Sequence, residues 1–136
     1  MKPLSFPDKS SLRLLITGSI STLILIVYYQ TLFYDFVYLD DLQFVINNTH
    51  LSKGFSKENL IWAFSSSTDI SKYYIPVTWL SFIMDYCLYG MNPGGFHLTN
   101  LLLHLVNANL LFVALLKFTK RTYLCAFVAC LFAVHP

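Results

Sequence analysis

The chain has 136 residues, of which 56% are hydrophobic and 12% are charged, and its formal net charge is +2. Soluble domains usually carry about 25% charged and about 45–50% apolar residues, so this composition excludes an ordinary soluble domain. We expect an all-α, polytopic membrane protein, with the lipid bilayer as its solvent and no nucleic acid as a partner.

The first predicted transmembrane helix covers residues 14–34 and follows a cytoplasmic N-terminus at 1–13. This run has no charged residue, and about 20 apolar residues suffice to cross a bilayer. A signal peptide is the alternative reading, because Lys2, Lys9 and Arg13 form a basic start. The run exceeds the usual 7–15 apolar residues and ends without a small-residue cleavage site, so an uncleaved anchor is favoured.

Residues 35–95 are predicted to form an external loop that contains two short interfacial helices. The first covers about 56–65, where Ser56 is a suitable cap and Glu58 lies in the first turn, favoured by the helix dipole. It is too short to cross a membrane.

The second interfacial helix is predicted at about 76–89, because Pro76 suits a first turn and Gly90 suits a helix end. Its side chains sort into a narrow polar strip, an aromatic strip and an apolar side. Asp85 lies in the polar strip, and an amphipathic packing helix is favoured over a catalytic role for this residue.

The second transmembrane helix is predicted at 96–118, followed by a cytoplasmic turn at 119–122 and the start of a third helix at 123–136. Basic residues flank the start of the first span and this turn, which places the N-terminus and the turn on the cytoplasmic side and the loop in the periplasm or the ER lumen. These residues are Lys2, Lys9, Arg13, Lys117, Lys120 and Arg121. Since the chain stops at an apolar run, we expect an N-terminal fragment with about three spans.

A polar stripe crosses the second span. His97, Asn100, His104 and Asn107 are spaced by three, four and three residues, so they share one face of a helix. Such groups face the protein interior rather than lipid. Hydrogen-bonding between helices is the favoured role for the deeper pair, His104 and Asn107. His97 lies at the external end.

An acidic pair, Asp40 and Asp41, follows Tyr38 and Leu39 just past the first span. Ionisable groups near hydrocarbon are costly and are often functional. The pair is therefore either a catalytic base site or the solvated end of a loop.

From Asp35 on, the chain resembles the GT-C membrane glycosyltransferases that carry tetratricopeptide repeats after their membrane domain, such as the transmembrane and tetratricopeptide-repeat O-mannosyltransferases. The resemblance rests on the order and spacing of several stretches. These are Tyr38–Asp41, Asn59–Phe64, Pro76–Ser81, Asp85-Tyr86, Gly90–Pro93, His97–His104 and His135-Pro136.

The resemblance implies an enzyme that transfers a sugar from a polyprenyl-phosphate donor to a protein or glycan acceptor on the external face. It implies that Asp40 or Asp41 is catalytic, and Asp41 is slightly preferred. His97, Asn100 and His135 are assigned to substrate binding.

No cofactor is required, and a divalent cation between Asp40 and Asp41 is left open. No histidine or cysteine spacing predicts a metal site. The alternative function is a non-catalytic structural or transport subunit, and we expect the fragment to be inactive alone.

Overall fold

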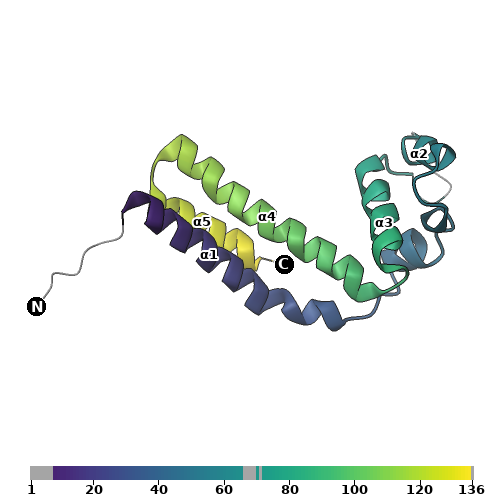
Figure 1. Ribbon diagram of the computed structural model, residues 1–136, viewed down its shortest axis with the longest axis horizontal. Helices are drawn as coiled ribbons and strands as arrows, with labels where there is room; N and C mark the ends of the chain where they lie inside the picture. Colours follow the sequence, from purple (N-terminus) through teal and green to yellow (C-terminus); the bar gives the residue numbers. More distant parts are fainter. Residues whose placement is uncertain (1–7, 66–69, 71, 136) are drawn as a thin grey trace, which may run out of the picture. The chain divides into compact units, whose positions relative to one another are not determined.

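The computed structural model describes residues 8–65, 70 and 72–135, and within these ranges the regular structure is helical, without a β-strand (Figure 1). The all-α prediction is confirmed. Lys2 and Pro136 lie outside the described residues. The elements are α1 (Lys9–Tyr28), the 3₁₀ turn η1 (Tyr29–Phe33), the π-helical turn η2 (Leu42–Ile46), the 3₁₀ turn η3 (Leu51–Lys53), α2 (Lys57–Ala63), α3 (Pro76–Tyr89), α4 (Pro93–Thr119) and α5 (Thr122–Val134).

The chain forms two compact units, which are described separately. The bundle unit comprises Met1–Gln30 and Asn100–Pro136, and the loop unit comprises Thr31–Thr99. Asp40, Asp41 and His97 therefore belong to the loop unit, whereas the predicted binding residues Asn100 and His135 belong to the bundle unit.

Helix α1 begins before the apolar run because Asp8 caps it. The Asp8 carboxylate accepts the backbone N–H of Ser11 at 2.7 Å, which satisfies one of the free donors of the first turn. Together with η1, α1 makes a 25-residue stretch from Lys9 to Phe33 that is long and apolar enough to cross a membrane. The helix thus includes a charged first turn that the sequence prediction, starting at residue 14, left out.

Helix α4 has 27 residues and is also long and apolar enough to cross a membrane, whereas α5 has 13. At 1.5 Å per residue, α5 covers about 20 Å, less than the ~30 Å hydrocarbon core. Length and composition therefore support two membrane-crossing helices, and a third span at α5 stays a prediction.

The bundle unit is held together by close packing of α1 against α5. Ile20 and Ile24 of α1 are fully buried, as are Ala129 and Ala133 of α5. Small residues at a four-residue spacing let helix backbones approach closely, which is how helices gain packing energy in a membrane.

Two residues reverse the chain between α4 and α5. Lys120 has φ 58° and is the non-glycine residue with positive φ in the described part of the chain. The left-handed conformation costs a side-chain-bearing residue about 1–2 kcal/mol. The Arg121 N–H donates to the hydroxyl of Thr119 at 3.3 Å, which helps to close the turn.

The loop unit has its own hydrophobic core, in which Val45, Leu51, Ile83 and Phe96 are buried together. These residues come from η2, η3, α3 and the start of α4, so the core joins segments distant in sequence. Around it pack the aromatic rings of Phe36, Phe44, Phe82 and Tyr86.

Local sequence signals set both short helices of this unit. The Ser56 hydroxyl accepts the Asn59 N–H at 3.1 Å, and α2 follows within the expected 56–65 range. Helix α3 occupies the expected 76–89, with Pro76 in its first turn and Gly90 at φ 62° after its end.

Candidate active site

The acidic pair lies in the helical turn that leads into η2. One Asp41 carboxylate oxygen accepts the Val37 N–H at 2.9 Å, and this side chain is half-buried. Asp40 is exposed, and no hydrogen bond within the described residues engages its carboxylate. The adjacent acids therefore differ in role: Asp41 fastens the turn, whereas Asp40 has a carboxylate that can accept a proton.

The acidic turn is anchored to the core of the loop unit on both sides. After the pair, Val45 of η2 is buried in the core. Before it, the Phe36 ring packs edge-on against Phe96, with 5.4 Å between ring centroids. The segments on both sides of the pair thus pack against the same core.

Large apolar side chains flank the acids and face outward. Tyr38 is 81% exposed and Leu39 is 77% exposed. Aromatic and aliphatic side chains exposed beside polar groups are typical of a surface that meets the headgroup level of a bilayer. The carboxylate of Asp40 thus lies beside a surface suited to lipid.

His97 directly follows the anchoring Phe96. Its Nε2 atom is buried and has no hydrogen-bond partner within the described part of the chain. Buried polar atoms are nearly always paired, so an unpaired one calls for a partner such as water or a ligand. Among the predicted binding residues, His97 thus has a buried ring nitrogen that can bond to a ligand.

The other polar residues of α4 divide into exposed and packed positions. Asn100 and Asn107 are exposed in the bundle unit. The Nε2 of His104 lies 3.1 Å from the Ala133 carbonyl, and because a carbonyl only accepts, Nε2–H is the donor. The Tyr28 hydroxyl likewise donates to the His135 carbonyl at 3.0 Å. His104 thus joins α4 to α5, as predicted, while Asn107 does not face the interior.

Asp85 is another acid of the loop unit, and the sequence analysis favours a packing role for it over a catalytic one. It is 2% exposed and accepts the Thr99 hydroxyl at 2.5 Å. Burial raises the pKa of the Asp85 carboxyl, and the Thr99 hydrogen bond opposes this rise in part. The pairing of α3 with α4 that buries Asp85 is a tertiary contact, which helix periodicity alone does not reveal.

A further polar network ties η3 to α2. The Asn59 amide donates to the carbonyls of His50 and Gly54 at 2.9 and 2.7 Å, and its oxygen lies 3.0 Å from His50 Nδ1. The His50 ring stacks on Trp62, with 3.9 Å between centroids and 6° between planes. Asn59 and Trp62 belong to the stretch that carries the family resemblance, and their contacts are structural.

Few side chains that could bind a metal ion lie together in the described residues. In residues 8–65, 70 and 72–135 there is no group of three or more His, Cys, Asp or Glu side chains placed to hold a metal ion. The two adjacent carboxylates, one of them engaged by Val37, are the acidic groups that the site offers.

Comparisons with known proteins point to one family. The chain is 31% identical over 114 residues to protein O-mannosyl-transferase TMTC3 of Homo sapiens. The aligned region covers 80% of this chain and 12% of that protein. It is 34% identical over 104 residues to protein O-mannosyl-transferase TMTC1 of Homo sapiens, and this alignment covers 71% of the chain and 12% of that protein. A protein O-mannosyl-transferase of Caenorhabditis elegans is 33% identical to the chain over 136 residues, and this alignment covers 91% of the chain and 19% of that protein.

The chain therefore spans between 12% and 19% of the length of these curated relatives. No family model matches it, and no solved structure matches it.

Proposed function

We propose that this chain, a relative of the protein O-mannosyl-transferases over most of its length, contributes the acidic site of a membrane glycosyltransferase. The donor is a polyprenyl-phosphate-linked sugar, and the acceptor is a hydroxyl group of a protein or glycan. The relatives' names suggest mannose as the sugar and a protein as the acceptor. The single observation that carries the proposal is the exposed carboxylate of Asp40. Its neighbour Asp41, by contrast, accepts a hydrogen bond from the Val37 N–H.

Asp40 acts as the general base. Its carboxylate takes the proton of the acceptor hydroxyl while the hydroxyl oxygen bonds to the anomeric carbon of the sugar. The bond from that carbon to the phosphate oxygen breaks, and polyprenyl phosphate leaves with the electron pair. A positioned base of this kind contributes about 10²–10⁴-fold to the rate.

The preference for Asp41 in the sequence prediction is reversed here for a physical reason. One of two adjacent acids is expected to serve the fold, and Asp41 is the one that accepts a backbone N–H, at 2.9 Å. Asp41 therefore acts as a positioning residue that fixes the turn.

We propose that His97, which also belongs to the loop unit, contributes to the same site. Its buried Nε2 atom lacks a partner in the described residues, and a donor there suits an oxygen of the leaving phosphate or of the acceptor. The exposed Tyr38 and Leu39 provide the apolar surface along which a polyprenyl chain lies. Asn100 and His135 belong to the bundle unit, and their substrate contacts stay predictions from the resemblance: Asn100 is exposed, and the backbone carbonyl of His135 accepts the Tyr28 hydroxyl.

The test is sugar transfer in membranes that contain the complete gene product. Asp40→Asn keeps the side chain's size but removes the base, so transfer from polyprenyl-phosphate mannose to a peptide should fall about 10²–10⁴-fold. Asp41→Asn retains an oxygen for the Val37 N–H, so its rate should stay within about threefold of wild type. Asp35→Asn removes another exposed acid of the same segment and is the matched control.

Each outcome decides something. A large loss in Asp41→Asn with normal transfer in Asp40→Asn would return the base to Asp41. Wild-type rates in both variants would remove the site and favour the non-catalytic membrane subunit instead.

A further inference from the structure

A second polar site lies in the bundle unit, at the end where α1 and α5 begin and α4 ends. Eleven residues line a cavity of about 960 Å³ there, and they include four cations and no acid. The cations are Lys9 and Arg13 of α1, Lys117 of α4 and Lys120 of the turn. The sequence analysis used these residues only to orient the helices.

Within the described residues, no acid lines this cavity to offset its positive charge. Asp8, the acid next to Lys9 in sequence, does not line the cavity, and its carboxylate is engaged by the Ser11 N–H. Like charges repel, and the attraction of an anion bound between them offsets this repulsion. The arrangement therefore favours a bound anion.

The start of α5 adds backbone donors at the cavity, and the carbonyl groups that end α4 there oppose this positive field in part. Helix α5 begins at Thr122, which lines the cavity, and its first turn receives no side-chain cap from Arg121. Free N–H groups at a helix start attract anions such as phosphate. The turn also holds Lys120 in a left-handed conformation, φ 58°, that is costly for this residue type.

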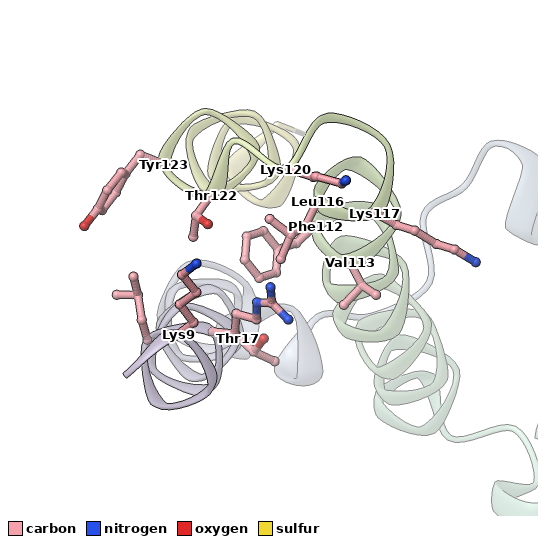
Figure 2. A pocket seen from close by; sticks show the side chains of 11 residues that line it. Lys9, Thr17, Phe112, Val113, Leu116, Lys117, Lys120, Thr122 and Tyr123 are labelled. Atoms are coloured by element: carbon pink, nitrogen blue, oxygen red, sulfur yellow. The ribbon is translucent and has the colours of Figure 1, made fainter. Parts of the chain in front are cut away.

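The walls of the cavity are apolar. Figure 2 shows Phe112 and Lys9 facing the space between the helices, while the Lys117 side chain extends away at the rim. Leu12, Val113 and Leu116 complete the apolar wall. A ligand with a negative head and hydrocarbon tails matches such a lining, and a free anion matches only the cations.

We propose that this basic cavity binds the phosphate headgroup of an anionic membrane phospholipid. Its position supports a lipid over a soluble anion, because α1 and α4 are long and apolar enough to cross a membrane and the cavity lies at their ends. Basic pockets between the ends of transmembrane helices bind such headgroups in other proteins. The proposal holds for either orientation in the membrane and does not depend on sugar transfer.

The experiment titrates the purified 136-residue chain in neutral detergent with short-chain phosphatidylglycerol and counts bound lipid by native mass spectrometry. Phosphatidylcholine controls for the tails, and inorganic phosphate controls for a soluble anion. We expect phosphatidylglycerol to bind selectively, and Lys9→Gln combined with Arg13→Gln to weaken it on the order of 10–30-fold. Lys117→Gln, at the rim, should have a smaller effect.

The matched control combines Lys53→Gln and Lys57→Gln, two exposed cations of the loop unit, and should bind like wild type. Helix content by circular dichroism, checked for every variant, separates lost binding from lost folding. Equal binding of phosphatidylcholine, or equal loss in the control, overturns the proposal. Displacement of the lipid by inorganic phosphate at similar concentration assigns the cavity to a soluble anion instead.

Discussion

Asp85 is the residue of the loop unit at which burial and charge conflict. Its carboxyl is 2% exposed, and burial raises its pKa more than the Thr99 hydrogen bond lowers it. A raised pKa in the folded state means that the protonated form suits the fold better. The stability that this acid contributes is therefore full below the unfolded pKa, about 3.9, and falls as pH rises through the folded value.

Asp85→Asn should imitate the protonated form at every pH. The amide oxygen still accepts the Thr99 hydroxyl, but no charge is buried. We expect the thermal midpoint of the variant to match that of wild type near pH 4 and to exceed it increasingly toward pH 8. Fluorescence of Trp62 and Trp79 during heating in detergent measures both midpoints.

Glu58→Gln is the control for this comparison, because Glu58 is an exposed acid. Its midpoint difference from wild type should be flat across the same pH range. A constant advantage for Asp85→Asn, or none, would show that the buried carboxyl does not titrate against the fold.

At the level of the elements, the polar network that joins η3 to α2, which we call the clamp, depends on one side chain. Asn59 is 1% exposed and pairs with two backbone carbonyls and with His50. Removing a buried partner leaves each remaining group unsatisfied, at about 1–3 kcal/mol per group.

Asn59→Ala should therefore destabilise the clamp by roughly 2–4 kcal/mol. Hydrogen exchange of the backbone amides in residues 50–63 should accelerate, because local opening becomes easier. Asn47→Ala, at an exposed asparagine of the same unit, is the matched control and should leave exchange unchanged. Equal exchange in both variants would contradict the role given to Asn59.

Some of these elements follow from the sequence and others do not. Helix α3 lies where Pro76 and Gly90 predict it, since both signals are local. The π-helical η2 was not predicted, because its extra residue per turn depends on burying Val45 in a core built from distant segments. The same limit applies to the site: the sequence indicates the acidic pair, but only the Val37 contact separates the role of Asp40 from that of Asp41.

At the scale of the molecule, the orientation in the membrane stays a prediction. Basic residues at the start of α1 and at the α4–α5 turn place both on the cytoplasmic side, and Cys87 on the opposite side. Cys125 is buried, so it reacts poorly with a maleimide in either orientation. Its labelling therefore cannot show on which side of the membrane the α4–α5 turn lies. Arg121 is exposed and offers a better position.

In intact bacterial cells that carry the protein in their inner membrane, an impermeant maleimide should label a variant with Cys87 as its sole cysteine. A cysteine-free background carrying Arg121→Cys should react only after the membrane is permeabilised. The opposite pattern would invert the topology and move the acidic pair to the cytoplasmic side. It would leave the phospholipid site unaffected.

The π-helical turn after the acidic pair also limits which insertions and deletions this segment tolerates. A π turn holds about one residue more than an α turn, so deleting one residue from η2 would leave a regular α-helix. Each residue of an α-helix turns the side-chain direction by about 100°. With Val45 fixed in the core, such a deletion would rotate Asp40 and Asp41 away from their present direction. Evolutionary change in chain length is therefore better accommodated in the exposed connections on either side than within these five residues.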